Sequence, residues 1–205
     1  MVNIRITNIK IGPKEKLLKY LIENKNPVSI RQVSGATFVD YKNIHELVNK
    51  LQLDGVITKG KLGNTNPISI NLAPNIEIYN VEKKRTEEFI LKNPKLKVVK
   101  SYIEEVNYPF FIVLVFSSYV NGTNTTGSDI DVCVIVDNED KSKELRQKLR
   151  LLPLKLEIHE FTIKEFISMI EKRQNNVGQE IVKNNIILYG VENYYNLIAK
   201  WMKRE

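Results

Sequence analysis

The chain has 205 residues and a formal net charge of +7. No apolar run reaches the roughly 18 residues of a membrane span, and the start of the chain lacks the apolar centre of a secretory signal, so a soluble, cytoplasmic protein with no membrane partner is expected. The single cysteine, Cys133, excludes an internal disulfide framework and a cysteine-rich zinc site; one cysteine with no catalytic partner is most often part of the core.

The positive charge is concentrated at the start of the chain. Residues 1–75 contain eleven basic and five acidic side chains, a net charge of +6, so the remainder carries only +1. Basic charge on a small module indicates an anionic partner, with nucleic acid the first candidate. A solvated, lysine-rich surface without a partner explains the same charge. A domain boundary is expected near residue 76.

Three helix signals occur in the first module. Pro13 suits the first position of a helix, and Ser29 with Gln32 forms a capping-box signature for a second, short helix. Asp40 can cap a third helix, which carries an apolar stripe at helical spacing. The stripe consists of Ile44, Leu47, Val48 and Leu51.

Two short strand patterns around a loop rich in Gly, Asn and Lys follow Asp54-Gly55 and predict a β-hairpin. Three helices and a hairpin in this order resemble a winged helix-turn-helix domain over residues 1–75. The resemblance implies a DNA-binding third helix and wing. Their candidate contacts are Lys42, Asn43, Asn49 and Lys50 with His45 on the helix, and Lys59, Lys61, Asn64 and Asn66 on the wing. Docking of a protein is the alternative, because Glu46 on the same helix would face the DNA.

Residues 76–94 are expected to form a connecting helix, with a helical pattern from Val81 to Asn93, and a second helix follows at about Leu96 to Val106. The run "YPFFIVLVFSS" then predicts a strand covered on both faces.

Two aspartates open the next apolar strand, in "SDIDVCVIV". Residues two apart on a strand point to the same face, so Asp129 and Asp131 present two carboxylates while Ile130 and Val132 face the core. Such carboxylates repel each other unless a cation relieves them, and Mg²⁺ prefers oxygen ligands. Ahead of them, Ser117-Ser118 ends a strand, and backbone N–H groups at the following helix N-terminus suit phosphate.

These residues resemble the minimal, antitoxin-like form of the polymerase-β nucleotidyltransferase superfamily. The family pattern is Gly-Ser at a strand end, a Gly four residues after the Ser, and Asp-x-Asp; Ser118, Gly122 and the "SDID" of 128–131 match it. The first Gly of the pattern is Ser117 here. The resemblance implies an α/β (α+β) fold over residues 76–205, with a mixed sheet and flanking helices.

The activity implied is a two-metal, Mg²⁺-dependent transfer of a nucleoside monophosphate to a small molecule or a protein such as a cognate toxin, with AMP from ATP as the expected transfer. Ser117, Ser118, Gly122 and Ser128 would bind the nucleotide, and a homodimer could complete the acceptor site. The alternative, favoured by Ser117, is a winged-helix transcription regulator whose transferase-like domain binds nucleotide without turnover.

A third carboxylate is needed to complete the metal site or to activate the acceptor hydroxyl. The segment "LPLKLEIHEFT" alternates like a strand, with Leu154, Leu156 and Ile158 as its core-facing set. Glu157 and His159 therefore face the aspartates, whereas Glu160 does not. Glu157 is expected to act with Asp129 and Asp131 in metal binding and catalysis, and His159 to support them. The alternative is that both glutamates are surface residues of an edge strand.

The last elements predicted are two helical segments. Thr162 with Glu165 is a capping box that opens a helix, and "IILYG" followed by "NYYNLIAKWMKR" is interpreted as a closing helical segment. Tyr194, Leu197, Ile198 and Trp201 have packing spacing there. Base stacking by Tyr189, Tyr194 or Tyr195 is one role open to them, and core packing is the other.

Overall fold

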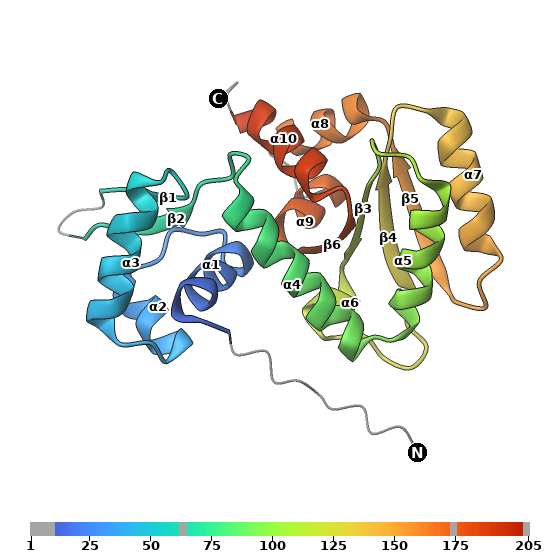
Figure 1. The fold of residues 1–205 in the computed structure, drawn as a ribbon. Helices are drawn as coiled ribbons and strands as arrows, with labels where there is room; N and C mark the ends of the chain where they lie inside the picture. Colours follow the sequence, from blue (N-terminus) through green and yellow to red (C-terminus); the bar gives the residue numbers. More distant parts are fainter. Residues whose placement is uncertain (1–10, 62–64, 173–175, 203–205) are drawn as a thin grey trace, which may run out of the picture. The chain divides into compact units, whose positions relative to one another are not determined.

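The computed structural model describes residues 11–61, 65–172 and 176–202 (Figure 1). The chain divides into two compact units, Met1–Asn71 and Leu72–Glu205. The sequence placed this boundary between residues 75 and 76. No helix in the described ranges is long and apolar enough to cross a membrane.

In its described residues, 11–61 and 65–71, the N-terminal unit contains three helices and a two-stranded antiparallel sheet. Its capping groups are those expected: the Ser29–Gln32 capping box is complete, and the Asp40 side chain accepts hydrogen bonds from the backbone of Lys42 and Asn43. The elements are α1 (Pro13–Glu23), α2 (Ile30–Thr37), α3 (Tyr41–Leu53), β1 (Ile57–Lys59) and β2 (Ile68–Ile70).

A small aliphatic core holds this unit together. The helical stripe of α3 contributes three buried side chains, and α1, α2 and both strands contribute others. The core residues include Leu17, Leu18, Leu21, Ile22, Val33, Ile44, Val48, Leu51, Val56, Ile57, Ile68 and Ile70.

The C-terminal unit is built on a mixed four-stranded sheet in the order β5-β4-β3-β6. β4 and β5 are parallel, and the other two pairings are antiparallel, so the expected mixed sheet is confirmed. Its elements are α4 (Ile76–Lys92), α5 (Lys95–Val106), β3 (Ile112–Phe116), α6 (Ser118–Asn121), β4 (Ile130–Ile135), α7 (Glu139–Arg150), β5 (Leu156–Phe161), α8 (Ile163–Glu171), α9 (Val177–Lys183), β6 (Asn185–Tyr189) and α10 (Val191–Met202).

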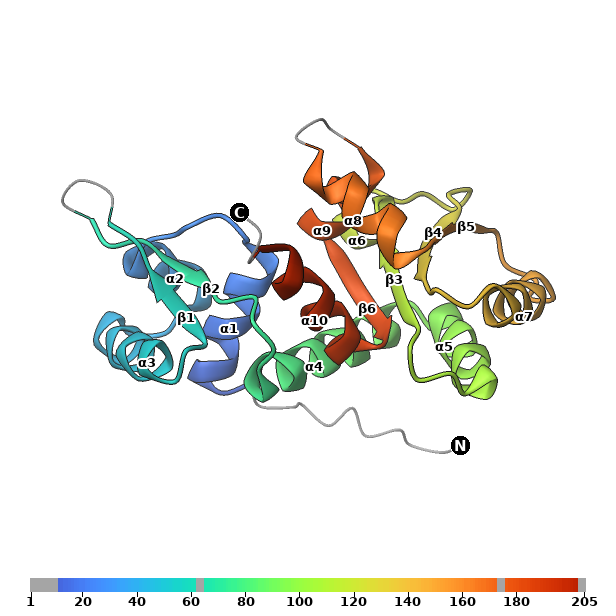
Figure 2. The ribbon, with the colours of Figure 1, turned by 90° about the horizontal axis from the view of Figure 1, so that it is seen from above.

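β3 is a central strand, and all five of its residues are buried, as its unbroken apolar run predicts. Helices α5 and α7 lie side by side on one face of the sheet (Figure 2), and their aliphatic side chains form a continuous core with those of β3, β4 and β6. Helix α8 contacts strand β5, and helix α10 contacts strand β3. Functional polar groups of β4 and β5 therefore have to lie on the face that α5 and α7 leave uncovered.

Helix α4 is more than a connection. It begins five residues before the Val81 pattern, because the side chain of Asn75 accepts a hydrogen bond from the Glu77 N–H. It then runs along the β6 edge of the sheet, where Thr86 donates to the carbonyl of Ile187 at 2.7 Å and Arg85 donates to that of Asn185 at 3.3 Å. Interpreting residues 76–94 as a linker helix was therefore incomplete.

The segment "IILYG" was wrongly included in the closing helix. Its residues lie in β6, which pairs with β3, and the helix starts only at Val191. Gly190 separates the two with φ +78°, and a Cβ there would lie 2.0 Å from the Phe111 carbonyl oxygen. Tyr194 and Tyr195 are each 2% exposed, so these two rings belong to the core and cannot stack on a base.

Candidate active site

The Asp-Ile-Asp sequence lies at the start of β4. Ile130 and Val132 are buried in the core beneath α5 and α7, so Asp131 faces the opposite side. Asp129 was expected on the strand, but β4 begins at Ile130 and Asp129 is the exposed residue before it. Its side chain is more exposed than that of Asp131, which is half-buried.

The neighbouring strand brings further polar groups to Asp131. β5 runs parallel to β4 in a register that pairs Asp131 with Glu157 and Cys133 with His159. The Nε2 atom of His159 lies 3.5 Å from Glu157 Oε1 and 3.8 Å from Asp131 Oδ1. One ligand atom from each of the three side chains lies within 4.8 Å of the others. The sequence predicts that His159 points to this face but assigns metal binding to the carboxylates, with His159 only supporting them.

The three side chains offer both oxygen and nitrogen donors to a divalent cation. Asp131 and Glu157 supply the carboxylate oxygens that Mg²⁺ prefers, and His159 adds a nitrogen donor of the kind that favours transition metals. Asp129 is outside the group of three. The expected metal set of Asp129, Asp131 and Glu157 is thus brought together only in part.

Glu160 lies on the other face of β5. Its carboxylate accepts a hydrogen bond from Ser142 at 2.6 Å and pairs with Arg146 at 3.0 Å, both on α7. The strand thus separates two glutamates three positions apart, one toward Asp131 and one toward α7.

Two apolar side chains adjoin the polar cluster. The ring of Phe116, at the end of β3, makes an edge contact with His159 at a centroid distance of 5.4 Å. Cys133 is fully buried, and burial raises the pKa of its thiol. Because the thiol stays protonated at neutral pH, Cys133 serves as a core residue rather than as a nucleophile or a metal ligand.

The turn after β3 has an unusual backbone. Ser117 has φ +61° and ψ −141°, a conformation that is essentially restricted to glycine. The chain then forms the single helical turn α6, and Gly122 ends it at φ +69°. A Cβ at Gly122 would meet no protein atom within 4 Å, so the positive φ is what favours glycine at this position.

Two features of this loop bear on the predicted phosphate contacts. α6 has only four residues, so its macrodipole is weak compared with that of a long helix. The Oγ atom of Ser128 accepts a hydrogen bond from the Thr125 N–H at 2.9 Å within the loop. The hydroxyl groups of Ser117 and Ser118 remain the nearest candidates for phosphate contacts.

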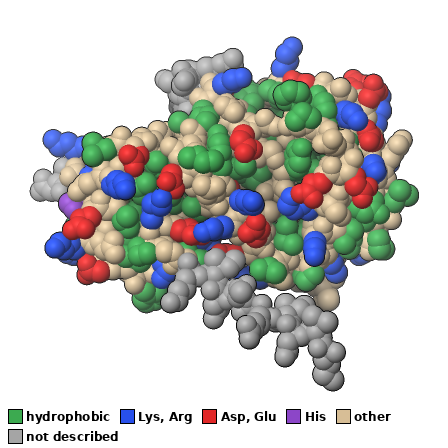
Figure 3. Space-filling model, in the orientation of Figure 1, with side chains coloured by type: hydrophobic (Ala, Val, Ile, Leu, Met, Phe, Trp, Pro, Cys, Tyr) green, Lys and Arg blue, Asp and Glu red, His purple; other side chains and the backbone are tan. Residues whose placement is uncertain are grey.

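The candidate DNA contacts of the N-terminal unit are exposed polar groups on α3 and at β1. Lys59 donates to Asn49 at 2.6 Å, and Asn49 lies 3.3 Å from His45, so the β1 end is tied to the face of α3. Lys42, Asn43, Lys50 and Lys61 are exposed, as is Glu46, and Asn64 lies outside the described residues. On the face drawn in Figure 3, basic and acidic side chains are interspersed over this unit.

Residues 97–193 match the family model described as "Polymerase beta, Nucleotidyltransferase". The matched range begins in α5 and ends in α10, so it contains the whole sheet, the Ser117 turn and the Asp131 cluster. The match supports placing this part of the chain in the polymerase-β superfamily, and with it a general nucleotidyl-transfer function. Searches of curated proteins and of solved structures gave no match.

Proposed function

We propose that the C-terminal unit transfers a nucleoside monophosphate from a nucleoside triphosphate, with ATP the first candidate, to a hydroxyl group of a protein or small-molecule acceptor. The observation that carries this proposal is the convergence of Asp131, Glu157 and His159 inside the range that matches the nucleotidyltransferase family. Alternation in the sequence oriented Glu157 and His159 toward the aspartates, and the register of β4 and β5 places Glu157 beside Asp131.

Asp131 and Glu157, with Asp129 at the strand start, would hold Mg²⁺. Bound magnesium supplies positive charge that neutralises the phosphate oxygens as the bond to the leaving group breaks. Ser117 and Ser118 donate hydroxyl hydrogen bonds to the phosphates, while the turn that ends at Gly122 sets their direction.

The transfer joins the acceptor oxygen to the α-phosphorus of the triphosphate. The bond from that phosphorus to the bridging oxygen breaks, and pyrophosphate leaves with the electron pair. The acceptor proton passes to the Glu157–His159 pair, whose closest polar atoms are 3.5 Å apart. A general base in this position typically contributes 10²–10⁴-fold to a rate.

Two glutamates on opposite faces of one strand provide the test. The protein is incubated with Mg²⁺ and each labelled nucleoside triphosphate in a lysate of its source organism, and label is followed into discrete products. Asp131→Asn and Glu157→Gln should lower transfer by at least about a hundredfold, whereas Glu160→Gln, the matched control, should retain it. Equal loss in both glutamate variants, or loss in Glu160→Gln alone, would contradict the assignment.

The alternative is a regulator that binds nucleotide without turnover, and the glycine-like conformation of Ser117 is the observation that favours it. Label transfer separates the two proposals, because only the enzyme yields labelled product. Calorimetry tests what they share, which is metal-dependent ATP binding that weakens in Asp129→Asn and Asp131→Asn. If the acceptor is a protein, a cognate toxin is one candidate. A homodimer could complete the acceptor site, because the C-terminal unit is small.

For residues 1–75 we propose contact with DNA in the manner of a winged helix, supported by the net charge of this segment and by the order of three helices and a hairpin. Binding should weaken steeply with salt because phosphate neutralisation releases counterions. Changing Lys42, Lys50, Lys59 and Lys61 together to Glu should abolish the anisotropy change of a labelled duplex. The same change at Lys83, Lys97, Lys143 and Lys164, all exposed in the other unit, is the control. A full chain that ignores DNA at low salt would favour protein docking instead.

A further inference from the structure

The two edge strands of the C-terminal sheet, β6 and β5, differ in how they are covered. Along β6, helix α4 covers the edge, and Arg85 and Thr86 bond to its carbonyl groups. β5 forms the opposite edge. Uncovered edges are ready to pair with another strand.

The backbone groups available on β5 can be identified from the register. Ile130 donates to the carbonyl of Lys155 and Val136 donates to that of Phe161, so the odd-numbered residues of β5 bond to β4 along the parallel ladder. The N–H and C=O groups of Leu156, Ile158 and Glu160 therefore point away from the sheet. Among the described residues they have no backbone partner.

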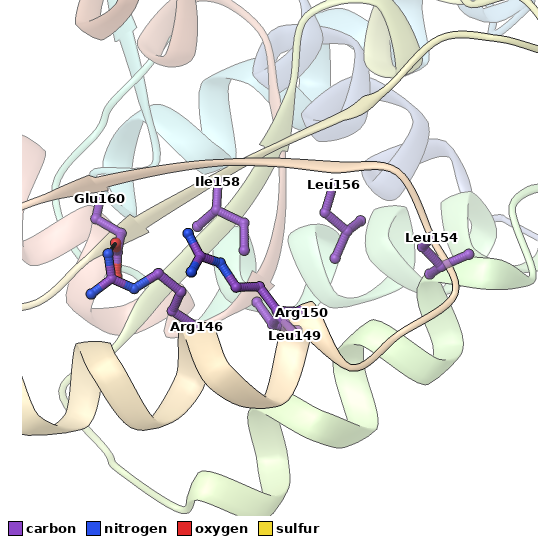
Figure 4. Close-up of a pocket in the computed structure, with 7 residues that line it drawn as sticks. All are labelled: Arg146, Leu149, Arg150, Leu154, Leu156, Ile158 and Glu160. Atoms are coloured by element: carbon purple, nitrogen blue, oxygen red, sulfur yellow. Dashed lines mark ion pairs between the residues drawn. The ribbon is translucent and has the colours of Figure 1, made fainter.

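A cavity of about 260 Å³ lies between this edge strand and α7 (Figure 4). Its apolar lining residues are Leu149, Leu154, Leu156 and Ile158, and its polar ones are Arg146, Arg150 and Glu160. In Figure 4 the side chains of the strand point toward α7, and both arginines reach up from the helix toward the strand. The cavity thus runs beside the outward backbone groups.

The charge of the cavity favours an anion. Arg146 is paired with Glu160 at 3.0 Å, whereas Arg150 is exposed and has no ion-pair partner within the described ranges. A guanidinium group binds a carboxylate through two parallel hydrogen bonds. A ligand that adds to this edge should accordingly carry one apolar and one acidic side chain on the same face.

We propose that the β5 edge docks an extended, acidic protein segment as an additional strand, with an apolar side chain in the cavity and a carboxylate on Arg150. Backbone pairing supplies affinity in this mode of recognition, and alternate side-chain pockets supply specificity. Residues of the added strand that point away from α7 lie on the face of Glu157 and His159. If the docked segment is also the acceptor, which rests on the proposed transfer, the residue between the apolar and the acidic one faces this site. Its hydroxyl group is then the one that receives the nucleotide.

The test uses the full chain and a fluorescent heptapeptide, Thr-Thr-Leu-Tyr-Glu-Thr-Thr, blocked at both ends. Binding is measured without nucleotide, so its outcome is independent of the transfer reaction. Arg150→Glu, or replacement of the peptide Glu by Lys, should weaken binding about tenfold or more, the loss of one charge-assisted pair. Lys143→Glu, an equal charge change at an exposed site of α7 outside the cavity, should leave binding unchanged.

Hydrogen exchange identifies the edge itself. Saturating peptide should slow exchange of the Leu156, Ile158 and Glu160 amides, whereas those of Glu157, His159 and Phe161 are already protected by β4. Binding that survives Arg150→Glu, the absence of binding, or protection elsewhere would overturn the proposal. Protection of the same amides that grows with protein concentration alone would show pairing with a second copy and would also overturn it. A peptide that docks but is not labelled would leave the edge site standing and refute only its use as acceptor.

Discussion

Ser117 occupies a backbone conformation that a side chain makes unfavourable. Its φ of +61° and ψ of −141° place it in a region where residues other than glycine incur about 1–3 kcal/mol of strain. The family pattern has glycine at this position, and the turn that the glycine would form is present here with serine. The chain thus keeps the turn at a cost in stability, so the role of the Ser117 hydroxyl group can be tested by substitution.

Ser117→Gly should raise the free energy of unfolding by about 1 kcal/mol, because relief of strain exceeds the 0.5–1 kcal/mol of added chain entropy. Ser117→Ala keeps the Cβ and should not be stabilised, so it is the matched control in urea unfolding. Nucleotide binding should be preserved or raised in the glycine variant. A glycine variant that folds normally but binds nucleotide much more weakly would show that the hydroxyl group itself holds the phosphates.

Glu165, in the first turn of α8, makes a pH-dependent contribution to the stability of the fold. Hydrogen bonds from the Thr162 backbone and hydroxyl lower the pKa of its carboxyl group. A lowered folded-state pKa stabilises the fold above the unfolded-state value, and this stabilisation is lost as the pH falls through the folded-state pKa. The free energy of unfolding is measured with urea between pH 3 and 7. The difference between Glu165→Gln and wild type should be largest at pH 7 and smallest at pH 3. Glu180→Gln, exposed on α9, is the control; a difference that grows toward acid would contradict the sign.

At the scale of elements, α4 is fixed to the C-terminal unit by a buried polar network. Glu82 forms an ion pair with Arg85 one turn later and accepts a hydrogen bond from Tyr195 of α10 at 2.7 Å. The side chain of Asn185 in β6 donates to Tyr194 at 3.0 Å. Burial and the nearby Glu82 carboxylate raise the pKa of Tyr195, so its hydroxyl remains a donor. The helix is thereby bound to both β6 and α10.

Removing one member of the buried pair should be costly because it leaves the other charge uncompensated. Arg85→Met should lower the free energy of unfolding by about 3–5 kcal/mol. The double variant Glu82→Leu/Arg85→Met removes both charges and should be more stable than the single one. Urea unfolding of the two single variants and the double variant forms a mutant cycle, and additive losses would show that the pair is not coupled.

At the scale of the whole molecule, the compact C-terminal unit is larger than the range that matches the family. The unit starts at Leu72, whereas the match starts at residue 97 and omits α4. Without α4, the β6 edge would be exposed and the carbonyl groups of Asn185 and Ile187 would lose their partners.

A fragment of residues 72–205 should therefore fold alone, and a fragment of residues 95–205 should not. The shorter fragment is expected to give poor dispersion in an amide proton–nitrogen spectrum and no cooperative thermal transition, while the longer one gives both. Cooperative unfolding of the shorter fragment would show that α4 is dispensable.

The sequence by itself determined the features that depend on neighbours in the chain. Capping boxes located the starts of α2 and α8, and the single cap residue Asp40 located that of α3. Alternation oriented Asp131, Glu157 and Glu160 on their strands, because side-chain direction follows from local backbone geometry. Only the tertiary structure decided which strands are neighbours. The contact of His159 with Asp131, the strand identity of "IILYG" and the docking of α4 on β6 all arise from pairing between distant segments, and local propensity carries no information about such pairing.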